Sequence, residues 1–217
     1  MYGWNVNVGP ASLGKRQDTR LPHGLFAGTL VAAETGWCPV ERLSTGDRVC
    51  TFDDGLQVVR DVRTRLLWNG KSSEDPAPVV VEVPSGALAN DRQLTLLPWQ
   101  ALLLECEKAS DAMGDPYAMI PVAALEGVCS ISRASVEKPM VIHSLVFDTD
   151  QAVYIDSGLI VHCQMPTGRR MRSRQQRYAV KSPAAAKALM TDLDLAELAL
   201  READNEFFGE AGPGQVA

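Results

Sequence analysis

His162 and Cys163 are adjacent residues whose side chains could together perform nucleophilic chemistry. A thiolate attacks carbonyl carbons, and an imidazole moves protons near neutral pH because its pKa lies close to 7. The pair follows the apolar run Leu159–Val161, which is typical of a buried strand. A thiol buried in this way stays protonated and inert. His143 lies in a similar run, and we expect it to be a hydrogen-bonded strand residue.

The remaining candidate ligands do not form a metal-binding pattern. The carboxylates Asp148, Asp150 and Asp156 lack the spacing of a calcium loop with its downstream glutamate. The cysteines are odd in number, include no C-x-x-C pair and lie within apolar runs, so we expect reduced, buried thiols without zinc, disulfide or cofactor. The five are Cys38, Cys50, Cys106, Cys129 and Cys163.

Composition indicates a globular protein with one main domain. The 217 residues are 46% hydrophobic and 22% charged, and the net charge of -6 gives no general attraction to nucleic acid. The sequence contains neither an apolar run of about 18 residues nor a secretory signal pattern. We therefore expect a soluble, cytoplasmic protein that does not bind membranes.

The elements between residues 25 and 165 are predicted to be β-strands. Short apolar runs such as Val79–Val83 and Ala101–Glu105 alternate with turn residues, and Asp53-Asp54-Gly55 predicts a hairpin. About eight to ten strands follow from this pattern, without a helix long enough to connect parallel strands. The fold class is therefore predicted to be all-β and antiparallel.

The two ends of the chain differ from this region. Residues 1–24 lack periodicity and are predicted to be a flexible arm, and residues 166–182 form an arginine-rich linker. Ser182-Pro183 is a helix start, so residues 183–217 are predicted to be an acidic helical tail. Its leucines could dock onto the β domain, onto a protein partner or onto a second copy of the chain.

Three separate blocks of the sequence carry a recognisable pattern. The first consists of Gly28, Thr29, Gly36, Pro39, Val40, Glu41, Leu43, Gly46, Asp47, Val49, Thr51 and Asp53. The second runs from Leu94 to Leu103, and the third runs from Val153 to Cys163. In this order the blocks resemble the hedgehog/intein (Hint) family, in particular its bacterial intein-like branch. The resemblance implies a horseshoe of antiparallel strands over residues 25–165, followed here by the helical tail.

The resemblance also implies a chemistry, which is self-catalysed cleavage or splicing of the peptide chain through an N-to-S/O acyl shift. That reaction needs a nucleophile, a proton donor for the departing nitrogen and donors for the oxyanion. Compared with the family pattern, Ala27 takes the nucleophile's place, and Leu97 and Gln100 take those of a hydroxyl and a histidine. In the last block, Asp150 precedes Gln151, and the closing His-Asn of inteins is His162-Cys163.

Three hypotheses about function follow. The first is a silent Hint module that acts as a structural or protein-interaction domain. The second is an autoprocessing domain that uses His162 and Cys163. The third is binding of an anionic partner by the segment Arg169–Arg177, although this segment lacks the interleaved aromatic residues of a nucleic-acid stacking platform, so nucleic acid is not the expected partner.

Overall fold

Short apolar runs separated by turn residues form strands along most of the chain in a computed structural model. The structure describes residues 23–68, 77–106, 116–136, 138–164 and 177–190. These residues contain fourteen strands, and every strand pairing is antiparallel, which confirms the predicted all-β class. The predicted arm and most of the predicted linker and tail lie outside the described residues.

The largest sheet has eight strands and brings the first and last parts of the β region together. Within it, β13 pairs with β14 and also with β2 and β4, and β14 pairs with β9 through Val161 and Leu102. Its strands are β2 (Leu30–Ala33), β3 (Gly36–Pro39), β4 (Arg48–Thr51), β5 (Gly55–Val58), β9 (Ala101–Glu105), β10 (Tyr117–Pro121), β13 (Gln151–Ile155) and β14 (Leu159–Cys163).

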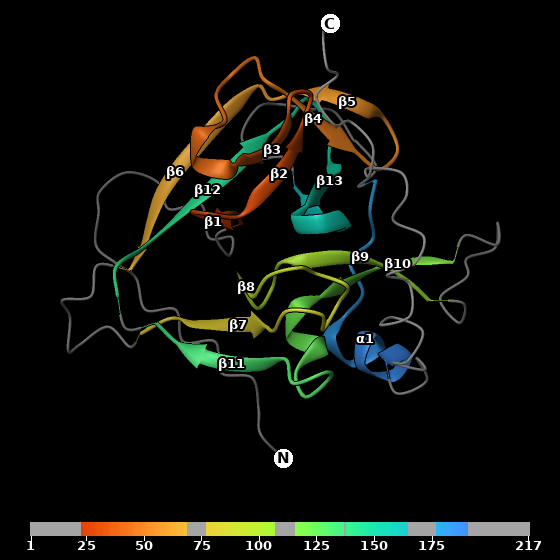
Figure 1. Ribbon diagram of the computed structural model, residues 1–217. Helices are drawn as coiled ribbons and strands as arrows, with labels where there is room; N and C mark the ends of the chain where they lie inside the picture. Colours follow the sequence, from red (N-terminus) through yellow and green to blue (C-terminus); the bar gives the residue numbers. More distant parts are fainter. Residues whose placement is uncertain (1–22, 69–76, 107–115, 137, 165–176, 191–217) are drawn as a thin grey trace, which may run out of the picture.

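Two smaller sheets complete the architecture. In one, β12 (Met140–Val146) lies between β1 (Leu25–Phe26) and β6 (Asp61–Trp68). In the other, β7 (Val79–Val83) lies between β8 (Leu94–Leu96) and β11 (Ser132–Ser135). Figure 1 shows β6 and β12 as a long ribbon that runs from the region of β4 and β5 towards β7 and β11.

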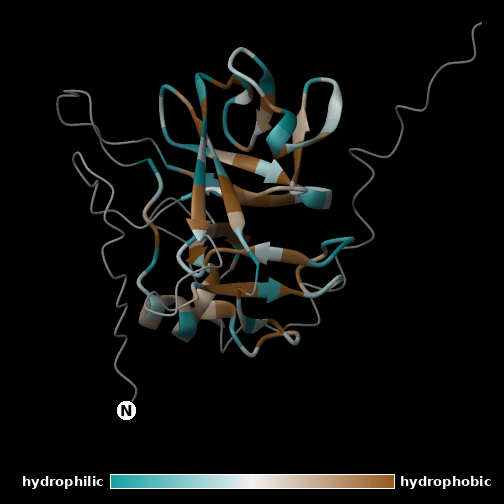
Figure 2. Ribbon diagram, turned by 90° about the vertical axis from the view of Figure 1, so that its left-hand side faces the viewer, coloured by the Kyte–Doolittle hydropathy of each residue, from teal (hydrophilic) through white to brown (hydrophobic). Residues whose placement is uncertain are grey.

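Alternation of side chains along the strands produces one main hydrophobic core and two smaller clusters. Val31, Val81, Leu102 and Val153 are fully buried in the main core, although they come from widely separated parts of the chain. Each such aliphatic side chain contributes about 1.5–3 kcal/mol when it leaves water. Figure 2 shows hydrophobic residues along the strands and hydrophilic residues concentrated in the connecting turns.

The segment from Arg177 to Met190 returns to the β domain. Val180 forms a parallel bridge with Met119, and the amide of Lys181 donates to the carbonyl oxygen of Met119 over 2.9 Å. Helix α1 (Pro183–Met190) begins after Ser182, whose hydroxyl accepts from the amide of Ala185 at 3.3 Å, as the Ser-Pro signal predicts. Ala186 is fully buried in the main core, so this turn of helix is an integral part of the packing.

In the described residues, short 3-10 helices at Val40–Arg42, Val122–Leu125 and Asp156–Gly158 connect strands. Among the described elements, no helix has the length and apolar character needed to cross a membrane.

Candidate functional site

Ala27 is exposed in the turn that follows β1. The amide of Thr29 donates to the carbonyl of Phe26 over 3.1 Å, and the amide of Gly28 donates to Oε2 of Glu41 over 2.8 Å. This second bond lowers the pKa of Glu41 because it favours the ionised carboxylate. A methyl group at residue 27 supplies no nucleophile, and the surrounding turn is held by backbone contacts.

Leu97 is completely buried in an apolar cluster with Phe26, Val80, Val136 and Ile142. The second block of the sequence motif is thus packed against the strand that precedes Ala27. The contact between them is purely hydrophobic, so the position that the resemblance assigns to a hydroxyl serves as core.

Gln100 is buried just before β9, where its backbone and side chain form three hydrogen bonds. Its amide donates to the carbonyl of Leu97 at 3.0 Å, and its carbonyl accepts from the amide of Val122 at 2.8 Å. Its side-chain Nε2 donates to the backbone carbonyl of His162 at 2.6 Å. An amide does not titrate at neutral pH, so Gln100 joins the second and third sequence blocks without supplying a proton shuttle.

His162 is buried on β14, with its ring against that of Tyr178 at a centroid separation of 5.5 Å and an interplanar angle of 70°. Its Nε2 lies 3.9 Å from Oδ2 of Asp150, which is too long for a hydrogen bond, and it has no hydrogen-bond partner among the described residues. The structure therefore brings Gln100, His162 and Asp150 together, whereas Leu97 belongs to a different apolar cluster from Tyr178.

Cys163 follows on the same strand and pairs with Gln151 of β13. Burial raises the pKa of the Cys163 thiol to about 12, so the thiol is protonated at neutral pH. The five cysteines are all free thiols. In the described part of the chain, no three or more His, Cys, Asp or Glu side chains are grouped so that they could hold a metal ion.

A second polar group lies where the chain enters β1. The hydroxyl of Ser144 on β12 donates to the backbone carbonyl of His23, and Nδ1 of His143 lies 3.3 Å from Oγ1 of Thr64. Gly24 has φ +156°, and a Cβ atom there would lie 3.0 Å from both Ser144 Oγ and the His143 carbonyl oxygen. The close approach of β12 therefore favours glycine at this position.

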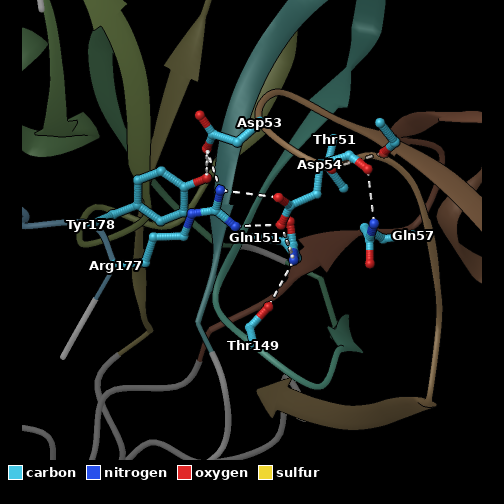
Figure 3. A network of polar contacts seen from close by, with 9 residues as sticks. Thr51, Asp53, Asp54, Gln57, Thr149, Gln151, Arg177 and Tyr178 are labelled. Atoms are coloured by element: carbon cyan, nitrogen blue, oxygen red, sulfur yellow. Dashed lines mark hydrogen bonds and ion pairs between the residues drawn. The ribbon is translucent and has the colours of Figure 1, made fainter. Parts of the chain in front are cut away.

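The most extensive polar network was not expected from the sequence. Arg177 pairs with Asp54, the hydroxyl of Tyr178 donates to Asp53, and Gln151 supports the same acidic turn from below (Figure 3). From the sequence, Asp53-Asp54-Gly55 predicts a hairpin turn, and Arg177 ends the arginine-rich segment that is a candidate for binding an anionic partner. A basic residue followed by an aromatic one was the only signal in the sequence, and it is a weak one.

The chain is similar to known proteins of one family. A family model described as the Hint domain matches residues 23–161, which is more than half of the chain. A search of curated proteins finds no match. The structure is similar to the solution structure of a bacterial intein-like domain from Clostridium thermocellum, with 14% identity and a TM-score of 0.46, covering 65% of this chain and 99% of that one.

It is also similar to a GSH-linked, splice-inactive variant of the AceL NrdHF class 3 split intein, with 12% identity and a TM-score of 0.41, covering 66% of this chain and 99% of the intein. Both similarities are low, so the assignment rests on the family model. This chain belongs to the Hint domain family.

Proposed function

We propose that this protein is a Hint domain that does not process its own chain and that acts as a structural or interaction module. The observation that carries the proposal is the packing of Leu97, which is completely buried in an apolar cluster at the position the family pattern gives to a polar group. Burying a hydroxyl there without a partner would be costly. The core at this position is built for a hydrocarbon side chain.

The absence of a nucleophile does not depend on the alignment of Ala27 alone. Strand β1 is flanked by Gly24 and Ala27, and the residues from 24 to 27 are Gly, Leu, Phe and Ala, none of which carries a hydroxyl or a thiol. Formation of an ester or thioester needs one of these groups next to the scissile bond. The missing histidine at residue 100 removes the proton donor as well.

The alternative of autoprocessing through His162 and Cys163 meets a physical obstacle. Attack requires a thiolate, and burial disfavours the charged form of Cys163. His162 does not offset this cost, because its ring faces Tyr178. The other alternative, binding of an anionic partner by Arg169–Arg177, concerns residues of which the structure describes only Arg177, and Arg177 is paired with Asp54.

Restoration of the missing groups tests the proposal. A triple variant, Ala27→Cys with Leu97→Thr and Gln100→His, places a thiol directly after β1. We expect the parent to keep its full mass with and without a thiol, and the restored variant to break next to its new cysteine. Gln100→His alone is the control and should stay intact.

A break in the parent that disappears in Cys163→Ala would support the autoprocessing alternative and overturn the proposal. Circular dichroism of each variant checks that the β fold is kept, so that an intact chain can be attributed to missing chemistry and not to unfolding.

A further inference from the structure

The acidic turn between β4 and β5 holds two consecutive residues of the C-terminal segment. Nη1 and Nη2 of Arg177 donate to the two carboxylate oxygens of Asp54, the second over 3.1 Å, and Nη2 lies 3.7 Å from Oδ2 of Asp53. The hydroxyl of Tyr178 donates to Asp53. A two-pronged contact of this kind is specific to arginine, since lysine cannot present two parallel donors.

The carboxylate that receives Arg177 is positioned from beneath by a buried amide. Nε2 of Gln151, a residue that is 1% exposed, donates to Oδ2 of Asp54 over 3.0 Å and to Oγ1 of Thr149 over 2.8 Å. Figure 3 shows Gln151 and Thr149 on one side of Asp54 and Arg177 on the other. The orientation of Asp54 is therefore supported by the domain, independently of the arginine.

The ring of Tyr178 makes a separate set of packing contacts. It stands edge-on to the ring of His162 and packs against the apolar cluster of Ala101, Leu103, Met119 and Ala152. Nε2 of His162, on the ring beneath Tyr178, is buried and has no hydrogen-bond partner in the described chain. An aromatic side chain thus has a fitted apolar surface directly beside the acidic turn.

From these contacts we propose that Asp53, Asp54, Gln151 and His162 form a recognition site for an arginine followed by an aromatic residue, and that the chain fills it with its own Arg177-Tyr178. The proposed ligands are peptides that contain an arginine followed by an aromatic residue. This inference rests on the proposed function, because it names a ligand class for the interaction module. The recognition site is tested by peptide binding, whereas the proposed function is tested by chain cleavage, so either proposal can fail without the other.

The segment that carries Arg177-Tyr178 is held more weakly at this end than at α1, so an external peptide can replace the Arg177-Tyr178 pair. Arg177 and Asp54 are 37% and 33% exposed, and ion pairs at this exposure are weakened by solvent and salt. Farther along the chain, Ala186 is fully buried in the main core. The Arg177-Tyr178 end can therefore leave its site while α1 stays in place, and an external peptide can then enter.

The experiment uses the full-length chain with Arg177→Ala and Tyr178→Ala, labelled with ¹⁵N. The probe is a synthetic peptide that copies residues 175–184, Gln-Gln-Arg-Tyr-Ala-Val-Lys-Ser-Pro-Ala. It is added at about 1 mM, the effective concentration typical of a tethered segment. We expect amide shift changes at residues 53, 54, 151 and 162 in the variant, and at least tenfold weaker binding to the parent, whose site is filled.

Two matched peptides test specificity: replacement of the arginine by lysine or of the tyrosine by alanine should weaken binding severalfold. If the variant keeps the amide signals of α1 but shows no shift changes with the peptide, the proposal is wrong. Equal binding by parent and variant would also overturn it, because the peptide would then bind elsewhere.

A second measurement covers the case in which the double variant does not fold. In Asp54→Asn, hydrogen exchange at the amides of residues 178 and 179 should be at least tenfold faster than in the parent. The control Arg60→Gln breaks the exposed pair between Arg60 and Asp148, which lies 2.7 Å apart, and should leave this exchange unchanged. Equal exchange in Asp54→Asn and the control would show that the acidic turn does not hold the segment.

Discussion

Gln100 donates a hydrogen bond from its side chain to the backbone carbonyl of His162 over 2.6 Å, and this bond joins the two sequence blocks that the family chemistry would require to meet. Both residues are buried. Gln100 therefore acts as a fixed link between the start of β9 and β14.

Replacement of Gln100 by alanine should destabilise the fold by about 1–3 kcal/mol, because the carbonyl of His162 is left buried without its partner. Urea unfolding followed by circular dichroism measures the change. Gln57→Ala is the control, since Gln57 makes a bond of the same kind to the carbonyl of Asp54 at an exposed site, where water can replace it. A similar loss in both variants would contradict the structural role of Gln100.

Leu97→Ala should cost about 2–5 kcal/mol, through lost burial and the cavity that remains. Leu97→Thr should also destabilise, because its hydroxyl enters an apolar cluster. Leu66→Ala, at a leucine that is 54% exposed, should change stability by less than about 0.5 kcal/mol. The same denaturation measurement applies, and a Leu97→Ala variant as stable as the parent would argue against the packing described.

Acid should release Arg177 from the acidic turn. Hydrogen bonds from Arg177 and Gln151 hold the pKa of Asp54 below its ordinary value of 3.8, so the folded state favours the carboxylate. The stabilisation is therefore present above pH 3.8 and is lost as the pH falls through the lowered pKa. NMR signals of the Tyr178 ring should report this transition in the parent and in Asp148→Asn. In Asp54→Asn, only the protonation of Asp53, which accepts from the Tyr178 hydroxyl, should still change them.

Cys163 should react slowly with iodoacetamide in the folded protein. Burial raises the pKa of its thiol to about 12, so little thiolate is present at neutral pH. Alkylation at residue 163, followed by peptide mass spectrometry at pH 8, should therefore be at least about 100-fold faster in denaturant than in the folded protein. Equal rates in the two states would remove the physical objection to a nucleophilic Cys163.

Strands with clear apolar runs could be predicted from the sequence, and polar or very short strands could not. β7 and β9 have the predicted bounds. β11 was missed because its sequence, Ser-Arg-Ala-Ser, is mostly exposed and shows no hydrophobic alternation.

Other differences arise from contacts between distant residues. β1 has only two residues, and its place is set by pairing with β12. The stretch from Ile120 to Leu125 divides between the end of β10 and a 3-10 helix, because Ile120 pairs with Leu102 of β9. Tertiary pairing decides such segments more strongly than local propensity does.

In the candidate site, too, the contacts between distant residues could not be predicted from the sequence. The assignment of Ala27, Leu97 and Gln100 to the family site rests on resemblance and stays a prediction. The bond from Gln100 to His162 spans 62 residues and has no sequence signal. The pairing of Arg177 with Asp54 spans 123 residues, and local sequence cannot distinguish such an arginine from a solvated one. Only the folded chain reveals that both pairs meet.

The most direct test of the central claim is the intact mass of the purified, unmodified chain after prolonged incubation at neutral pH with a thiol and, separately, with hydroxylamine. Both reagents cleave a chain that forms a thioester or an ester in its backbone. A Hint domain without its nucleophile should keep the mass of all 217 residues under every condition. A discrete pair of fragments that accumulates with either reagent would contradict the account, and the masses would locate the nucleophile.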